Sequence, residues 1–324
     1  MTNADFSSRN AIRMEIVKDW NRALLYTGQG IEAEDITKFV SRFKEVDHSS
    51  VLEGNIAVAE RVSGLPIARY MVDPRDIFNN NIALQMVVHT LNVSSGDLAL
   101  EKLDTTEDLV GAGHSLGEAG AMDAAGVYPN RQSSMEFVFE RASDMQKAYK
   151  RNPGTLYLLM GLNEDNAVNL PAELEVDLAL INGPQLTVVA SDIGRFAEIE
   201  AEAKKAGARK VIDLKIPPFH TRRMLQARVD LEAFARAEGR EFRTAIFPIV
   251  SNYDGEEGLD GYGLVIKHIT SVTNPVRWTD VIRRINHPGV TFYTMGPGTN
   301  PADLNKANKV PAEQTKDLFQ LLAE

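Results

Sequence analysis

The stretch Gly111-Ala112-Gly113-His114-Ser115-Leu116-Gly117-Glu118 decides how the rest of the chain is interpreted. It contains Gly-His-Ser-Leu-Gly, which matches the G-x-S-x-G pattern of a tight strand-to-helix turn that raises a serine hydroxyl above the end of a sheet. Gly113 and Gly117 flank the serine, and their lack of a Cβ atom would let the strand and the helix approach closely. The pattern predicts that Ser115 is a nucleophile.

The residues on either side of this motif have the patterning that such a turn requires. Residues 108–113 are typical of a short buried strand, and residues 117–126 are typical of a helix built from small residues. A helix that begins just after Ser115 directs free N–H groups and the positive end of its dipole toward whatever the serine attacks. Because a pentapeptide of this kind also arises by chance in loops, its meaning depends on the remaining sequence.

The longer string Gly-His-Ser-Leu-Gly-Glu resembles the active-site motif of malonyl-CoA:acyl carrier protein transacylases and of the acyltransferase domains of polyketide synthases. The resemblance extends over about residues 24–306. It is carried by three further strings, which are Gly28-Gln29-Gly30, Asn274-Pro275-Val276-Arg277-Trp278 and Gly296-Pro297-Gly298. Two positions depart from the family pattern, because Asn81 stands where glutamine is usual and Thr299 stands where lysine is usual.

This resemblance implies an α/β fold, in which a large α/β-hydrolase-like domain with a core of parallel strands carries an inserted small subdomain. Within residues 153–216 the predicted order of elements is strand, helix, strand, strand, helix and strand, which is the ferredoxin-like βαββαβ pattern. We therefore expect 153–216 to form the small subdomain. Residues 1–152 and 217–324 are expected to form the large catalytic domain.

Apolar spacing gives further local expectations. Isoleucines and a tryptophan at intervals of four predict a helix up to about Ala23, and a strand is expected at residues 23–26. Residues 33–105 are expected to be mostly helical. The segment between Val88 and Leu109 contains small and acidic residues and is expected to be a surface connection.

Composition limits the possible environments and partners. The 324 residues carry a formal net charge of −10, which argues against general nucleic-acid binding. No apolar run approaches the ~20 residues of a membrane span, and the N-terminus lacks the features of a secretory signal. Because the sequence contains no cysteine, disulfides and thiolate chemistry are excluded, and a cytoplasmic location is expected.

The resemblance assigns the catalytic roles. Ser115 would attack a thioester, and His220, which follows two prolines, would act as its general base. The backbone N–H groups of Gln29 and Leu116 would form the oxyanion hole, and the backbone carbonyl of Arg277 would orient the histidine. The chemistry implied is that of an [acyl-carrier-protein] S-malonyltransferase, which needs no metal or other cofactor.

The same resemblance assigns residues to the acyl group. Arg141 lies on a predicted helix at the spacing of the arginine that pairs with the malonyl carboxylate in the family. Phe219, directly before His220, resembles the Phe-His pair of malonyl-selective acyltransferases. Asn182, in an Asn-Gly-Pro turn, and His114, beside the nucleophile, complete the predicted substrate-binding set.

Malonyl-CoA and an acyl carrier protein are the implied partners, and the sequence leaves open whether that carrier serves fatty-acid or polyketide synthesis. Carrier proteins are acidic, so this acidic chain needs local positive charge to bind one. The candidates, which are equally compatible with an ordinary solvated surface, are Lys204, Lys205, Arg209, Lys210, Arg222 and Arg223.

Three alternative functions fit the sequence less well. A true α/β-hydrolase would place its histidine near the C-terminus, whereas about a hundred residues follow His220 here. An acyl hydrolase of the transacylase fold would release the acyl group to water, but such enzymes tend to lack the arginine found at Arg141. A non-enzymatic scaffold of the same fold would not need Ser115, His220 and Arg141 together.

Overall fold

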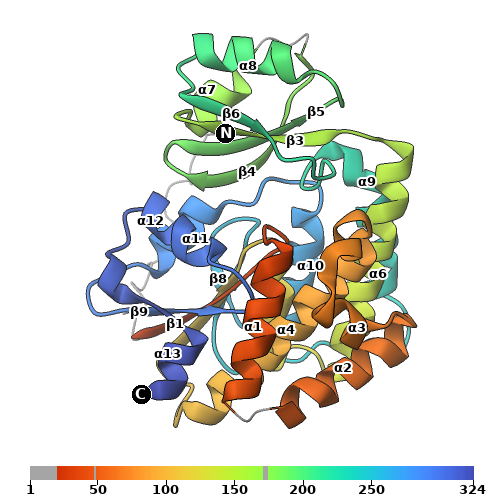
Figure 1. Ribbon diagram of the computed structural model, residues 1–324, viewed down its shortest axis with the longest axis vertical. Coiled ribbons are helices and arrows are strands. Elements are labelled where there is room, and N and C mark those ends of the chain that lie inside the picture. The colour runs from red at the N-terminus through yellow and green to blue at the C-terminus, as the bar shows by residue number, and fades with distance from the viewer. Residues whose placement is uncertain (1–19, 47–48, 171–173) are drawn as a thin grey trace, which may run out of the picture.

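The structure, a computed structural model, describes residues 20–46, 49–170 and 174–324. It contains a six-stranded sheet and a four-stranded sheet, and the smaller sheet lies above the larger one in Figure 1. This arrangement confirms the predicted α/β fold with a parallel core and a second, smaller unit.

The larger sheet has the strand order β10-β9-β1-β2-β7-β8. In this order, each strand from β10 to β7 runs parallel to the next one. The edge strand β8 pairs with β7 in the antiparallel direction. The strands are β1 (Arg22–Tyr26), β2 (Leu109–Gly113), β7 (Ile249–Val250), β8 (Glu257–Gly258), β9 (Thr291–Met295) and β10 (Thr315–Asp317). β10 was not expected from the sequence, because three half-buried residues give too short a pattern to recognise.

Helices cover both faces of this sheet, as its buried strands require. Those before β3 are α1 (Ala33–Glu45), α2 (Ser49–Ser63), α3 (Ile67–Val72), η1 (Pro74–Asn79), α4 (Asn81–Lys102), α5 (Gly117–Ala124) and α6 (Arg131–Arg151). Those after the small sheet are η3 (Arg222–Met224), α9 (Leu225–Ala235), α10 (Gly261–Ser271), α11 (Trp278–Ile285), α12 (Asn300–Ala307), η4 (Ala312–Gln314) and α13 (Leu318–Ala323).

The smaller sheet has the order β4-β5-β3-β6 and is entirely antiparallel. Its elements follow the predicted βαββαβ order: β3 (Thr155–Met160), α7 (Glu164–Val168), β4 (Asp177–Gly183), β5 (Leu186–Ser191), α8 (Phe196–Lys205) and β6 (Lys210–Asp213). All six elements lie within residues 153–216, and we propose that these residues are the inserted subdomain, with 1–152 and 217–324 as the large domain.

The two sheets share part of their core. Leu24 and Leu25 of β1 point to opposite faces of the large sheet and belong to different apolar clusters. The cluster around Leu25 includes Leu156 and Val188 of the small sheet. In addition, the Ile181 N–H donates to the Val276 carbonyl at 2.8 Å, so β4 is hydrogen-bonded to the large domain. The small unit is therefore packed directly against the body.

Two local expectations are corrected by the structure. The helix predicted up to about Ala23 lies mostly outside the described residues, and β1 begins at Arg22, so the strand expected at residues 23–26 is confirmed. Most of the surface connection expected between Val88 and Leu109 is instead the largely buried second half of α4, and only residues 103–108 form a connection. Ser94 and Ser95 fit into this helix because each hydroxyl donates to the carbonyl four residues before it.

Candidate active site

The G-x-S-x-G turn has the geometry that its sequence predicts. Ser115 lies between β2 and α5 and has a backbone φ of +52°, a conformation that residues other than glycine rarely adopt. A Cβ atom on Gly113 would lie 2.0 Å from the carbonyl carbon of Gly117, and one on Gly117 would lie 2.2 Å from the Tyr26 carbonyl oxygen. The two glycines are therefore required for β1, β2 and α5 to converge beneath the serine.

The serine and the predicted base are brought together from positions 105 residues apart. Ser115 Oγ lies 2.6 Å from His220 Nε2, and His220 Nδ1 lies 2.7 Å from the carbonyl oxygen of Ser271. A carbonyl oxygen only accepts hydrogen bonds, so Nδ1 carries the hydrogen and Nε2 is left to accept from the serine hydroxyl. This is the tautomer that a general base needs.

The prediction that the Arg277 carbonyl orients the base is wrong. The Arg277 carbonyl accepts from the N–H groups of Asp280 and Val281 in the first turn of α11. The orienting carbonyl belongs to Ser271, the last residue of α10. The final carbonyls of a helix have no intrahelical donor, so this one is available to a histidine.

The surroundings of His220 keep its ring neutral. Burial is the main reason that the pKa of His220 is lowered to about 3, and the positive charge of Arg141 lowers it further. The hydrogen bond to Ser271 acts in the opposite direction. At neutral pH the ring is therefore unprotonated and able to accept the serine proton.

The two predicted oxyanion donors lie beside the nucleophile. A Cβ atom on Gly28 would lie 2.6 Å from the His114 carbonyl oxygen, so the loop carrying Gln29 packs directly on the serine turn. Within the part of the chain that the structure describes, the backbone N–H groups of Gln29 and Leu116 have no acceptor. The side chain of Gln29 is held separately, by a 2.8 Å bond to Asn81 Oδ1. Their role in the oxyanion hole stays a prediction that this placement supports.

Arg141 is completely buried, although it is charged. It lies on α6 and donates from Nη1 to the side-chain oxygen of Gln85 on α4. Its Nε and Nη2 atoms, and Nε2 of Gln85, have no hydrogen-bonding partner within the described residues. Burial lowers the pKa of Arg141 to about 10, while the Glu118 carboxylate raises it. A buried cation with two unused donors in a fork matches the geometry of a carboxylate.

A cavity of about 300 Å³ opens between the two sheets at Ser115 and His220. Its polar side includes Gln29, His114 and Asn182, where His114 Nε2 lies 2.8 Å from Asn182 Oδ1. Its opposite wall consists of aliphatic side chains of the small unit and the segment after it, namely Leu156, Leu158, Leu180, Leu186, Val188, Leu214 and Ile216. Such a lining suits a long, partly apolar ligand whose reactive end lies at the serine.

Phe219 lies at the boundary of a second cavity. This one has a volume of about 520 Å³ and shares Gln29 and Phe219 with the cavity at the serine. Its other walls come from the start of α4, from α6 and from the segment around Lys215. Of the predicted substrate-binding residues, His114, Asn182 and Phe219 thus line the cavity at Ser115. Arg141 lines neither cavity, but its charge lowers the pKa of His220.

Three residues that support the serine were not assigned a role from the sequence. Asn252, just after β7, accepts from the Ser115 N–H at 3.3 Å and donates to the Gly113 carbonyl at 2.7 Å. Glu118 accepts from the Asn252 N–H at 2.8 Å and lies 2.6 Å from Nδ1 of His268. Asn252 stands at the carboxyl end of a parallel strand, a position that could have marked it.

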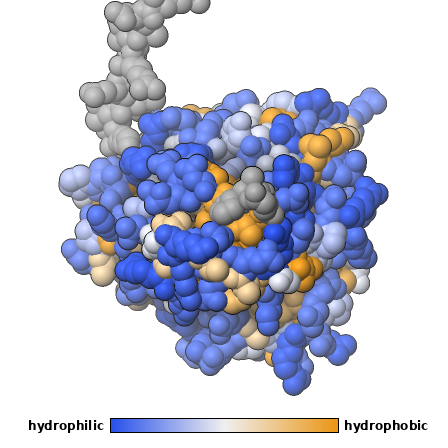
Figure 2. Space-filling model, turned by 90° about the horizontal axis from the view of Figure 1, so that it is seen from above, coloured by the Kyte–Doolittle hydropathy of each residue, from blue (hydrophilic) through white to orange (hydrophobic). Residues whose placement is uncertain are grey.

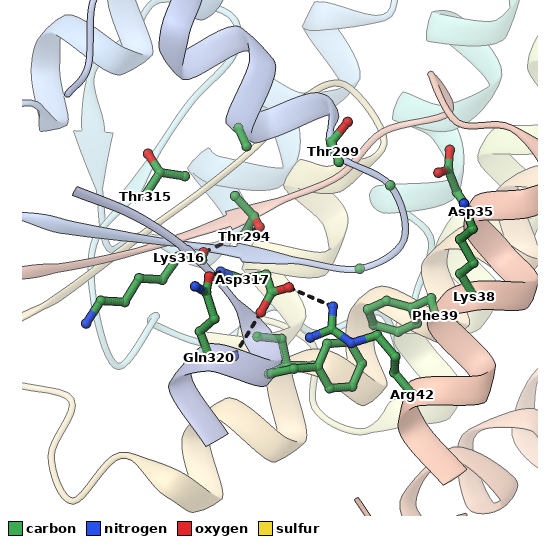
Figure 3. Close-up of a pocket in the computed structure, with 15 residues that line it drawn as sticks. Asp35, Lys38, Phe39, Arg42, Thr294, Thr299, Thr315, Lys316, Asp317 and Gln320 are labelled. Carbon is green, nitrogen blue, oxygen red and sulfur yellow. Dashed lines mark hydrogen bonds and ion pairs between the residues drawn. The ribbon is translucent and has the colours of Figure 1, made fainter. Parts of the chain in front are cut away.

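A further cavity, of about 310 Å³, lies between α1, β9, β10 and α13 (Figure 3). Its charged residues are engaged with their neighbours: Lys38 pairs with Glu34, Arg42 with Asp317 and Lys316 with Glu324, and Asp35 accepts from the Glu32 N–H. Thr299 lies here and donates to Asp303, away from Ser115. No group of residues suited to a metal ion is present in the described ranges. Those ranges also contain no helix with the length and hydropathy of a membrane span.

Sequence comparison connects this site to characterised proteins, although no family model matches the chain. Malonyl CoA-acyl carrier protein transacylase of Haemophilus influenzae is 26% identical over 231 residues, which are 69% of this chain and 73% of that protein. The protein of the same name from Synechocystis is 31% identical over 191 residues, which are 58% of this chain and 62% of that protein.

Solved structures show the same fold. An acyl-carrier-protein S-malonyltransferase from Burkholderia pseudomallei matches with a TM-score of 0.80 at 24% identity, over 92% of this chain and 96% of that one. A malonyl-transacylase solved in complex with a type II polyketide synthase acyl carrier protein matches with a TM-score of 0.80 at 24% identity, over 93% and 99% of the two chains. In sequence and in fold, the chain is similar to malonyl-CoA:acyl carrier protein transacylases, which supports the family resemblance seen in its motifs.

Proposed function

We propose that this protein transfers a malonyl group from CoA to the phosphopantetheine thiol of an acyl carrier protein through an acyl-serine intermediate. The observation that carries the proposal is the contact between Ser115 and His220, together with the buried, incompletely bonded Arg141 whose charge acts on His220. Ser115 and His220 would carry out acyl transfer. Arg141 would select an acyl group that bears a carboxylate.

In the first half-reaction, Ser115 Oγ attacks the thioester carbonyl while His220 Nε2 takes the hydroxyl proton. The carbonyl oxygen becomes an oxyanion, which the N–H groups of Gln29 and Leu116 would stabilise by about 3 kcal/mol each. Collapse of the tetrahedral intermediate breaks the C–S bond. His220 then returns its proton to the departing CoA thiolate, and the malonyl group remains on the serine as an ester.

In the second half-reaction, the carrier's pantetheine thiol enters the same cavity. His220 accepts the thiol proton, and the sulfur attacks the ester carbonyl of the malonyl-serine. Collapse of the second tetrahedral intermediate forms the new thioester, and the proton on His220 returns to Ser115 Oγ. The aliphatic wall of the cavity would exclude water from the ester between the two steps.

Arg141 would pair with the free carboxylate of the malonyl group. A carboxylate that enters a buried pocket must lose its water, which costs several kcal/mol unless a fixed cation replaces the lost hydrogen bonds. Nε and Nη2 of Arg141 can supply two such bonds. This feature favours transfer of malonyl over the hydrolase alternative, whose substrates need no such cation.

The structure reduces the number of basic residues that are available to bind an acidic carrier. Arg222 and Arg223 pair with Asp177, and Arg223 also pairs with Asp192. Lys204 and Lys205 pair with glutamates of α8, their own helix. Arg209 and Lys210, at the start of β6, are exposed and make no ion pair within the described residues, so we propose that they contribute most of the free positive charge.

The surface of this end of the molecule fits a polar contact. Seen from above the small unit, it is mostly hydrophilic, with hydrophobic areas limited to separate patches (Figure 2). The lack of cysteine agrees with the cytoplasmic setting proposed for the reaction.

The experiment that tests the proposal mixes the purified protein with malonyl-CoA, with and without a phosphopantetheine-bearing carrier. We expect the carrier to gain a malonyl group and free CoA to accumulate in proportion. Release of malonate at the same rate with and without the carrier would instead support the acyl hydrolase.

A further inference from the structure

A closed path of contacts connects the nucleophile to its base through residues that touch no substrate. Glu118 lies three residues after Ser115 in the first turn of α5, and its carboxylate contacts His268 Nδ1 at 2.6 Å. His268 lies on α10, three residues before Ser271. Ser271 accepts from Nδ1 of His220, whose Nε2 contacts Ser115. The path therefore returns to its starting point.

We infer that His268 is a positioning residue for the acyl-transfer reaction, and that its bond to Glu118 holds the nucleophile and the general base at their working distance. This inference rests on the proposed function. Its physical basis is that α5 fixes the serine and α10 fixes the carbonyl that orients the histidine. The bond between Glu118 and His268 is a side-chain hydrogen bond that joins these two helices.

The direction of that bond follows from its chemistry. A carboxylate oxygen accepts hydrogen bonds, so His268 donates from Nδ1. Burial lowers the pKa of His268, and the charge of Arg141 lowers it further, whereas Glu118 raises it. Nε2 of His268 has no partner within the described residues, so the ring is held through Nδ1.

The contact is stiffened at both ends. The second oxygen of Glu118 accepts from the Asn252 N–H, and Asn252 in turn accepts from the Ser115 N–H. On α10, the Ser271 hydroxyl donates to the His268 carbonyl at 2.7 Å, so that the last turn moves with the histidine. Glu118 is 1% exposed and His268 is fully buried. Apolar residues would fill this space at lower cost, which is why a buried polar pair here indicates a positioning role.

The test uses three substitutions at one position. Asparagine can place its amide nitrogen close to the position of Nδ1, glutamine places it close to Nε2, and leucine provides no donor. His268→Asn, His268→Gln and His268→Leu are compared with His89→Leu. His89 is a matched control because it is also a buried histidine with one 2.8 Å hydrogen bond, to Ser134, and lies outside the path.

Two measurements distinguish a positioning role of His268 from an effect on folding or on substrate binding. The rate at which a fluorophosphonate labels Ser115 reports nucleophilicity without any acyl donor, and kcat and KM for malonyl transfer report the complete reaction. We expect His268→Leu and His268→Gln to lower labelling and kcat by about 100-fold with KM nearly unchanged, because small misplacements of reacting groups have effects of that size. His268→Asn should recover most of both rates, and His89→Leu should retain them.

Wild-type labelling rates in the leucine and glutamine variants would overturn the inference. So would an asparagine variant as slow as the leucine variant, or a loss that appears in KM alone. If the leucine variant does not fold, the labelling rates and kcat values of the asparagine and glutamine variants decide whether the inference holds. If labelling follows the expected order but the wild-type protein transfers no malonyl group, the proposed function fails while the positioning role stands.

Discussion

Arg141 on α6 donates one hydrogen bond to the side chain of Gln85 on α4, and its Nε and Nη2 atoms remain without partners in the described part of the protein. The guanidinium is thus fixed in place by one contact and keeps two donors for another. Because Arg141 also lowers the pKa of His220, its charge would act on the proposed base as well as on a bound carboxylate.

The first prediction concerns acyl selection by Arg141. Arg141→Ala should lower kcat/KM for malonyl transfer by about 100-fold or more, because an unpaired buried charge costs about 3 kcal/mol. Transfer of acetyl, which has no carboxylate, should change little or rise. The kcat/KM of Arg141→Lys for malonyl transfer should be intermediate, because lysine keeps the positive charge but lacks the two parallel N–H donors of the guanidinium. Arg228→Ala, which removes an arginine paired with Glu232 on α9, serves as the control. An unchanged ratio of malonyl to acetyl transfer would contradict the assignment.

The second prediction concerns the pH dependence of serine reactivity. Because the pKa of His220 is lowered to about 3, labelling of Ser115 should persist well below pH 6.5, where an ordinary histidine would be protonated. Arg141→Ala removes a charge that lowers this pKa, so the acid limb should move to higher pH. Labelling rates measured against pH in both proteins check this. An acid limb near pH 6.5 in the wild type, or no upward shift in the variant, would be inconsistent with it.

The third prediction concerns stability. Burial lowers the pKa of His89 and of His220 to about 3, and it also lowers the pKa of His114 and His268. Between pH 6.5 and about 3, His89 and His220 bind protons in the unfolded chain but not in the folded protein. The free energy of unfolding should therefore fall as the pH decreases, by about 1.4 kcal/mol per pH unit for each such histidine.

Urea unfolding at several pH values measures this slope. His89→Leu should make the slope shallower by about one histidine. A slope that is the same in both proteins would mean that His89 is protonated in the folded state.

The fourth prediction concerns the α-carbon of the acyl group. Phe219 is 5% exposed and lines the cavity at Ser115 as well as the neighbouring cavity, so its ring should crowd an α-methyl substituent. We expect malonyl-CoA to be preferred over methylmalonyl-CoA by about 10- to 200-fold in kcat/KM, the range that one methyl group usually gives. Phe219→Ala should reduce this preference. Equal specificity constants in the wild type would remove Phe219 from the account.

Local sequence patterns predicted the parts of the site that depend on short-range geometry. The glycines beside Ser115 and the strand and helix that they join could be predicted because the close approach of backbones leaves no alternative residue. The βαββαβ order of the small unit followed from its hydrophobic periodicity. The pairing of Ser115 with His220, across 105 residues, came from resemblance to a family, since no local pattern encodes it.

The errors arose where tertiary packing decides. Ser94 and Ser95 have low helix propensity, but both are buried in the long helix α4. Ser94 accepts from the Asn55 side chain of α2, and Ser95 accepts from the Gly296 N–H just after β9. The choice of Arg277 instead of Ser271 placed the orienting carbonyl six residues too late, because the end of α10 is set by its packing. His268 gave no local signal, since its partner Glu118 is 150 residues away.

The central claim is that Ser115 carries the malonyl group between donor and acceptor, and intact-mass measurement tests it most directly. After brief mixing with malonyl-CoA, the wild-type protein should gain the mass of one malonyl group, located on Ser115. The added mass should disappear when a phosphopantetheine-bearing carrier is supplied and reappear on that carrier. Ser115→Ala should show neither step, and His220→Ala should show slow acylation and almost no transfer. Transfer at the wild-type rate by Ser115→Ala would contradict the account.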